Sequence, residues 1–227
     1  MDLPLVDAHL HLWDPREGRY GWLEEVPALN RPFLLHDYEK AFGGLNMQKM
    51  VFVECGSVPT QHIVEAEWIG QMANGEPRLS GIVATAPMEE GRAVGASLET
   101  LAAMKRVKGI RRNIQDEAEQ GFCLREGFIT AVKMLSTLEL SFDICIRHHQ
   151  MEDAIELVRR CPNVLFMLDH MGKPDIRHRR LEPWKSHMQA LACLPNVWCK
   201  ISGLATEADP EHWRPHDLKP YIDHAID

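Results

Sequence analysis

Short apolar runs alternate along the whole chain with longer stretches that repeat at the period of an α-helix. Seven runs have the length and composition of β-strands: Leu5–Leu12, Lys49–Cys55, Leu79–Ala86, Val107–Ile114, Ser141–Ile146, Val164–Leu168 and Val197–Ile201. The helical stretches between them are Gln61–Ala73, Val94–Met104, Leu124–Thr137, Met151–Arg160 and Pro183–Ala192, and another begins near His216. Strands that alternate with helices predict βαβ units and a parallel sheet.

The first apolar run decides between two folds of this class. A doubly wound dinucleotide-binding sheet usually has a glycine-rich phosphate turn after its first strand. Here that strand ends in histidines, so we predict a TIM-like (β/α) barrel in one domain over residues 1–227. A closed barrel has eight strands in about 250 residues. The sequence shows no eighth run, and Asp14–Pro32, with three prolines, is expected to be a long loop.

The segment VDAHLHLW, residues 6–13, carries the strongest local signal. Alternate residues of a strand share a face. One face of this strand carries Asp7, His9, His11 and Trp13. Polar groups on a buried strand are costly unless they are paired or bind something, and two imidazoles at this spacing can reach one metal ion. The alternative is a satisfied polar pair, but the position at the end of a first barrel strand favours the metal.

Two further strand ends carry acid or imidazole groups. Glu54 closes the apolar run MVFVEC, where it can be a metal ligand, a proton carrier or the partner of an arginine. Asp169 and His170 end the sixth strand, before a Gly-Lys-Pro turn. His170 can alternatively be a cap or loop histidine. With His9, His11 and Glu54 it makes a set of ligands for one divalent ion.

Cationic side chains lie within or directly after three other predicted strands. Arg111 in VKGIRRNIQ and Arg147 in SFDICIRHHQ suit a carboxylate or a polyhydroxy substrate, and internal ion pairs are the open alternative. Lys200 in NVWCKISG is either a cation that contacts substrate or an inert charge inside the barrel.

Composition narrows the class of partner. Lys and Arg number 25 against 33 Asp and Glu, so the net charge is −8, and no basic stripe predicts nucleic-acid binding. The six cysteines include no C-x-x-C pair and lie mostly in apolar runs, which is typical of reduced thiols in a cytoplasmic protein. The chain begins without a signal peptide and has no apolar run long enough for a bilayer, so we expect no membrane association.

Seven motifs in order resemble the amidohydrolase-related lactonases, which include L-rhamnono- and L-fucono-lactonases and 2-pyrone-4,6-dicarboxylate lactonase. They are VDAHLHLWDP, VFVECG, GIRRNIQ, FDICIR, LDHMGKPDIR, NVWCKISGL and DLKPYIDHAI, and they extend from about Leu5 to the last residue. The resemblance implies a distorted TIM-like barrel that hydrolyses a sugar-acid lactone.

The resemblance also assigns roles to residues. It implies that His9, His11 and His170 are catalytic, and that they bind a divalent ion such as zinc together with Glu54. Some members of the group work without a metal, so a metal-independent reaction stays open. Arg111 is the matching substrate-contacting arginine, and we place Arg147 and Trp13 in the same role.

The family's strand-eight motif, Gly-Ser-Asp-Trp-Pro, is absent from this sequence. Its Asp binds metal or acts on the attacking water, so we expect a truncated isoform with severe loss of turnover. We also expect a marginal fold, or self-association through the open edges of strands one and seven. The alternatives are a non-catalytic protein that binds ligand or a full-length partner, and a decarboxylase or other hydrolase of the same superfamily. A metal-dependent nuclease is disfavoured by the net charge.

Overall fold

The computed structural model describes residues 3–227 and divides the chain into two compact units. Unit 1 comprises Met1–Pro87, Val94–Arg111 and Leu138–Leu140. Unit 2 comprises Met88–Ala93, Arg112–Thr137 and Ser141–Asp227. In the described residues no helix is long and apolar enough to cross a membrane.

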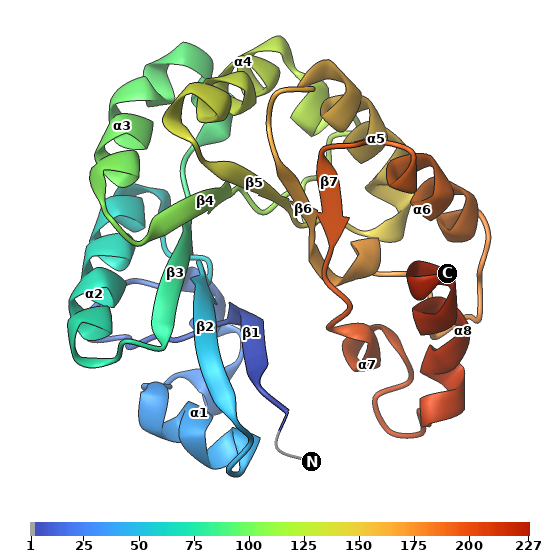
Figure 1. Ribbon diagram of the computed structural model, residues 1–227, viewed down its shortest axis with the longest axis horizontal. Helices are drawn as coiled ribbons and strands as arrows, with labels where there is room; N and C mark the ends of the chain where they lie inside the picture. The colour runs from blue at the N-terminus through green and yellow to red at the C-terminus, as the bar shows by residue number, and fades with distance from the viewer. Residues whose placement is uncertain (1–2) are drawn as a thin grey trace. The chain divides into compact units, whose positions relative to one another are not determined.

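Unit 1 is built on a parallel sheet in the order β1-β2-β3-β4. Its strands are β1 (Leu5–Leu10), β2 (Met47–Val53), β3 (Leu79–Ala84) and β4 (Val107–Arg111). Its helices are α1 (Leu35–Phe42), α2 (His62–Gly75) and α3 (Gly95–Ala103), and α2 and α3 lie along the same outer side of the strands (Figure 1). The strands are apolar because the sheet is covered, and Met50, Phe52, Leu79, Ile82 and Ile110 are almost fully buried.

Unit 2 repeats this plan with the parallel strands β5-β6-β7. They are β5 (Ser141–Ile144), β6 (Phe166–Leu168) and β7 (Val197–Cys199). The helices are α4 (Glu126–Met134), α5 (Met151–Arg160), α6 (Trp184–Ala192), α7 (Leu204–Glu207) and α8 (Pro215–Ile226). The rings of Phe128, Phe142 and Phe166 pack edge to face at the centre of this core.

The alternation of strands and helices predicted from the sequence is confirmed. Each of the seven predicted strands is present in the described residues, with ends displaced by up to a few residues, and α5 begins and ends where it was predicted. The segment after β1 forms only two short 3-10 turns, Gly21–Glu24 and Pro27–Leu29, as its prolines indicate. Helix α1 was not predicted, although Asp37 accepts a hydrogen bond from the Leu34 amide at 3.0 Å, a recognisable helix-start signal.

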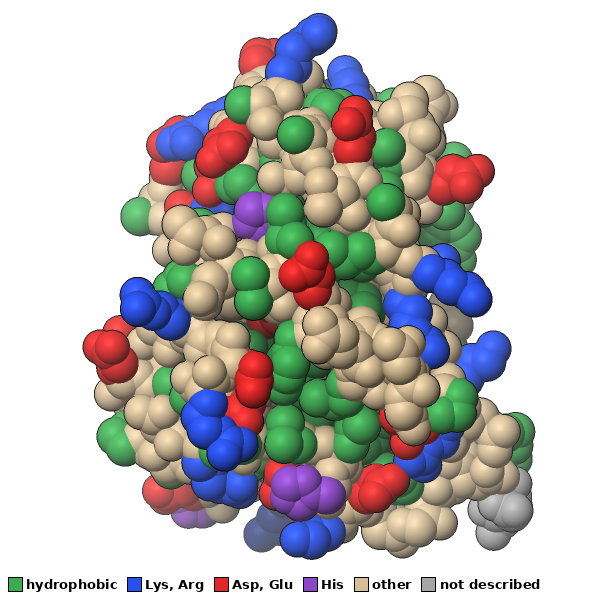
Figure 2. All heavy atoms as spheres, turned by 90° about the vertical axis from the view of Figure 1, so that its left-hand side faces the viewer, with side chains coloured by type: hydrophobic (Ala, Val, Ile, Leu, Met, Phe, Trp, Pro, Cys, Tyr) green, Lys and Arg blue, Asp and Glu red, His purple; other side chains and the backbone are tan. Residues whose placement is uncertain are grey.

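The outer surface of the molecule is mixed in charge on the face drawn in Figure 2. Acidic and basic side chains alternate there, and hydrophobic side chains are visible in furrows between them. A hollow in unit 1 is lined by Ala66, Gly70, Ile82, Met104, Lys105 and Arg106. Arg106 is structural, because its guanidinium donates to the carbonyls of Leu79 and Ala73.

Candidate functional site

The carboxyl ends of β1, β2 and β4 bring together four of the predicted site residues in unit 1. His9 and His11 lie on one face at the end of β1, as the alternation predicts, and their Nε2 atoms are 3.1 Å apart. The rings meet edge to face, with centroids 4.8 Å apart. Both histidines are half-buried, whereas Leu10 and Leu12 between and beside them are buried on the opposite face.

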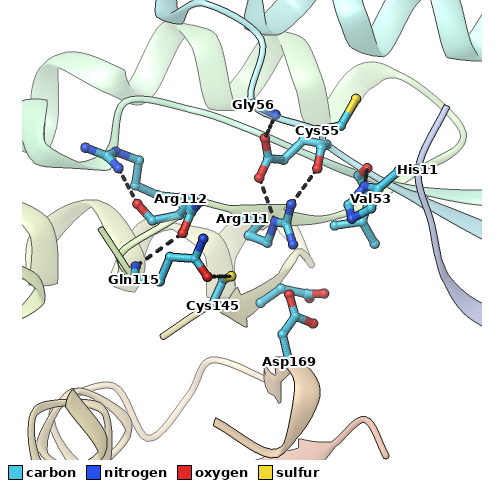
Figure 3. A network of polar contacts seen from close by, with 12 residues as sticks. His11, Val53, Cys55, Gly56, Arg111, Arg112, Gln115, Cys145 and Asp169 are labelled. Carbon is cyan, nitrogen blue, oxygen red and sulfur yellow. Dashed lines mark hydrogen bonds and ion pairs between the residues drawn. The ribbon is translucent and has the colours of Figure 1, made fainter. Parts of the chain in front are cut away.

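The hydrogen bonds of His11 define its tautomer. Its Nδ1 lies 2.8 Å from the carbonyl oxygen of Val53, which can only accept, so the Nδ1 atom carries the proton (Figure 3). In the neutral ring, Nε2 of His11 therefore carries the lone pair and faces Nε2 of His9. A backbone carbonyl that fixes the distal nitrogen in this way is a common arrangement behind metal-binding imidazoles.

Glu54 and Arg111 form a buried ion pair beside the two histidines. The Nε atom of Arg111 is 2.6 Å from Oε1 of Glu54, and its Nη2 donates to the Glu54 carbonyl at 2.5 Å. The other carboxylate oxygen accepts the Gly56 amide at 2.8 Å (Figure 3). Both side chains are less than a tenth exposed. Of the roles left open for Glu54, the structure shows the arginine partner, and its role as a metal ligand stays a prediction.

Arg111 is fixed so that one nitrogen points to the histidines. Nη1 lies 3.4 Å from Nε2 of His9, while the other two nitrogens are held by Glu54. A guanidinium is always protonated, so the imidazole pair stands next to a permanent positive charge. The cluster of His9, His11, Glu54 and Arg111 is called the β1–β4 cluster below.

A second buried group supports the ends of β1 and β2 and was missed in the sequence. The Cys55 thiol donates to the Leu12 carbonyl at 3.3 Å and lies 3.4 Å from Oε1 of Glu65. Tyr20 hydrogen-bonds to both groups. Burial, and then the charge of Glu54, raises the pKa of Glu65 to about 7. Glu65 lies on α2, where a helical acid is normally read as solvent-exposed, so its pattern offered no signal.

Trp13 belongs to an aromatic cluster that anchors the long loop after β1. Its indole donates to the Leu29 carbonyl at 3.1 Å, and its ring packs against Trp22 and Phe33. Trp13 lines a hollow together with His11, Phe33, Arg31 and Tyr38. A contact between Trp13 and substrate stays a prediction, and what the structure adds is its packing role.

The predicted residues of unit 2 occupy two different places. His170 is the second residue after β6, and its Nδ1 is 2.8 Å from Oγ of Ser202. Arg147 lies three residues beyond β5, is half-exposed and pairs with Asp116 at 3.2 Å. The convergence of His170 with His9 and His11, expected from the sequence, stays a prediction.

Lys200 is held between two aspartates in the sheet of unit 2. Its Nζ lies 2.5 Å from Asp143 and 2.9 Å from Asp169, and all three side chains are less than a tenth exposed. Because these contacts lie among neighbouring strands, Lys200 acts here as an internal charge. This corresponds to the second of the two roles that the sequence left open.

The chain matches known proteins over nearly its full length. The profile of the family described as Amidohydrolase matches residues 6–227. An L-fucono-1,5-lactonase of Burkholderia ambifaria is 30% identical over 219 residues, which are 96% of this chain and 73% of that protein. The crystal structure of an amidohydrolase from Burkholderia multivorans with bound zinc has a TM-score of 0.82 at 24% identity, over 97% of this chain and 78% of that one.

A more distant likeness concerns the fold alone. The crystal structure of a probable 2-pyrone-4,6-dicarboxylic acid hydrolase from Acinetobacter baumannii, with citric acid bound, has a TM-score of 0.74 at 13% identity. It covers 97% of this chain and 77% of that one. These matches confirm the predicted α/β class and its relation to the amidohydrolase barrels.

Proposed function

Since this chain belongs to the amidohydrolase family of hydrolases, we propose that it opens the ring of a sugar-acid lactone of the L-fucono-1,5-lactone type. The observation that carries the proposal is the β1–β4 cluster, in which two imidazoles and a fixed guanidinium meet at strand ends. The likeness to L-fucono-1,5-lactonases at 30% identity supports the substrate class.

The reaction adds water to the lactone carbonyl carbon, breaks the ring C–O bond and gives a hydroxy acid. Negative charge develops on the carbonyl oxygen, and Arg111, held rigidly by Glu54, offers a preorganised positive charge for it. His9 and His11 form a donor–acceptor pair that can take a proton from water and return it to the leaving oxygen. We assign His170 of unit 2 to the same reaction, following its predicted role.

The residues of the cluster also fit a divalent ion. Two imidazole nitrogens that share one tetrahedral zinc at 2.0–2.1 Å lie about 3.3 Å apart, and the two Nε2 atoms here are 3.1 Å apart. His9 and His11 would hold the ion, and a bound zinc was seen in the related Burkholderia multivorans structure. When bound, such an ion polarises the carbonyl oxygen as a Lewis acid. Arg111 can supply charge to the same oxygen, so the chain is also equipped for a metal-independent reaction.

The proposal is tested with a pH-indicator assay on L-fucono- and L-rhamnono-lactones, with the metal content of the purified chain measured in parallel. We expect turnover that is severely reduced, as the absence of the Gly-Ser-Asp-Trp-Pro motif from the sequence predicts, but still above the spontaneous rate. This turnover should be lost in His9→Ala and His11→Ala. His36→Ala is the matched control, because His36 is an exposed histidine on α1.

Three outcomes contradict the proposal in distinguishable ways. Release of carbon dioxide from an aromatic acid, in place of ring opening, identifies a decarboxylase of the same superfamily. Lactone binding without turnover identifies a protein that binds the ligand but does not hydrolyse it. Equal activity of His9→Ala and the parent chain removes the β1–β4 cluster from the reaction.

A further inference from the structure

His170 sits in a backbone conformation that ordinary residues avoid. The φ angles of His170, Met171, Gly172 and Lys173 are +52°, +55°, +67° and +52°. Three of these four residues carry side chains, and each such residue in the left-handed region costs on the order of 1 kcal/mol or more. Such a run of four residues persists only where the surrounding structure imposes it.

Three polar contacts hold this turn, one within the turn and two from residues outside it. The buried indole of Trp184 on α6 donates to the Met171 carbonyl at 2.6 Å. The Lys173 amide donates to the His170 carbonyl at 2.9 Å, which closes the turn. His148 contacts the Lys173 carbonyl through Nδ1 at 3.2 Å. The backbone of His170 and of the residues that follow it is therefore held by the protein itself, without a ligand.

The segment after β7 fixes the imidazole itself. Oγ of Ser202 is 2.8 Å from Nδ1 of His170. Gly203 comes next, with φ of +68°, and a Cβ at that position would lie 2.8 Å from Cγ and from Nδ1 of the ring. The chain therefore passes so close to the imidazole that only glycine fits, and this approach brings the Ser202 hydroxyl to Nδ1.

We propose that Ser202 is a positioning residue for His170. Its hydroxyl accepts the Nδ1 proton of the imidazole, which leaves the lone pair on Nε2, the nitrogen that can bind an ion or take a proton. Ser202 thus has the role for His170 that the Val53 carbonyl has for His11. The effect on turnover rests on the proposed lactonase function, whereas the tautomer of His170 does not.

The tautomer is measured by long-range ¹H–¹⁵N NMR on the full chain labelled at histidine, with His170→Gln used to assign the signal. We expect a protonated Nδ1 and an unprotonated Nε2 in the parent chain, and a mixture of tautomers in Ser202→Ala. Ser202→Thr keeps the hydroxyl and is expected to restore the parent spectrum. A parent ring protonated on Nε2, or a Ser202→Ala spectrum identical to the parent, overturns the proposal.

Kinetics on L-fucono-1,5-lactone give the second readout. Loss of a residue that orients a site histidine typically costs 10- to 100-fold, so we expect Ser202→Ala to lower kcat by about this factor with little change in KM. Gly203→Ala is expected to lower kcat further, because its methyl group would displace the ring. Ser186→Ala is the matched control, since Ser186 is exposed and bonds to Glu182.

The two failures can be told apart. A parent chain without lactonase activity removes the proposed function, and the NMR result still decides the role of Ser202. An active parent with unchanged kcat in a folded Ser202→Ala, whatever the tautomer, shows that the hydroxyl does not act on turnover and overturns that part of the proposal.

Discussion

Units 1 and 2 both bury a cation at their strand ends, but they use it differently. In unit 1 the Arg111 guanidinium pairs with the Glu54 carboxylate and presents a nitrogen to His9. In unit 2 the Lys200 ammonium lies between two carboxylates, Asp143 and Asp169. A guanidinium has five donors in a fixed plane and can bind a partner and still point elsewhere, whereas an ammonium is a point charge. The internal pairing of Lys200 shows a structural role, and the geometry of Arg111 is the basis for the chemical role that we propose for it.

The site histidines of the two units also differ in the local structure that carries them. His9 lies within β1, on the same face as His11, and the pairing of β1 with β2 is irregular between Asp7 and Leu10. His170 lies in a left-handed turn held by contacts from α6 and from the segment after β7. The site histidine of unit 1 therefore lies within a strand, whereas that of unit 2 lies in a turn whose conformation depends on tertiary contacts.

The largest effect is expected from Lys200→Met. Removing one partner of a buried ion pair typically costs about 3–5 kcal/mol, because the remaining charge is left uncompensated. Two aspartates face Lys200, so we expect the free energy of unfolding in urea to fall by this amount. Lys133→Met on the exposed face of α4 serves as the control. A loss below that of the control would refute the structural role of Lys200.

A pH-dependent effect is expected in unit 1 from Glu65. Its pKa is raised from 4.5 to about 7 in the folded chain, so the folded state binds the proton more tightly than the unfolded state. The contribution of Glu65 to the free energy of unfolding is therefore greatest below pH 4.5. It falls by about 3 kcal/mol at most as the pH rises to about 7. Glu65→Gln removes this loss and should be more stable than the parent at pH 8 in urea unfolding. If the free energy of unfolding has the same pH dependence in Glu65→Gln as in the parent between pH 4.5 and 7, the raised pKa of Glu65 is contradicted.

Arg111→Lys tests the chemical role of the cation in unit 1. A lysine keeps the charge but cannot bind Glu54 and face His9 together. We expect kcat/KM on L-fucono-1,5-lactone to fall on the order of 10²-fold, as for the loss of one preorganised donor. Arg92→Lys, at an exposed arginine, should leave kcat/KM unchanged. Full activity of Arg111→Lys would show that the guanidinium has no special chemical role, so that Arg111 would be a structural charge like Lys200.

The smallest effect is expected from Arg147→Ala. Its ion pair with Asp116 is half-exposed, and such pairs contribute about 0.2–1 kcal/mol. Thermal unfolding should therefore be nearly unchanged. A rise in KM without a change in kcat would support the predicted contact with substrate, and an unchanged KM would remove Arg147 from the site.

Features set by local periodicity could be predicted from the sequence, and those set by tertiary contact could not. The strands, the helix α5 and the shared face of His9 and His11 follow from spacing alone. The pairing of Glu54 with Arg111 joins residues 57 positions apart, and the sequence offered several other partners. The left-handed turn at His170 has one glycine in four residues, so its composition does not signal the conformation.

We propose above that the β1–β4 cluster opens a lactone ring. The most direct measurement follows L-fucono-1,5-lactone by NMR with the parent chain, with His9→Ala and without protein. We expect the parent to convert the lactone to the open-chain hydroxy acid faster than the buffer does, and His9→Ala to return to the rate of the buffer. Conversion at the buffer rate by the parent, or equal conversion by both proteins, would contradict it.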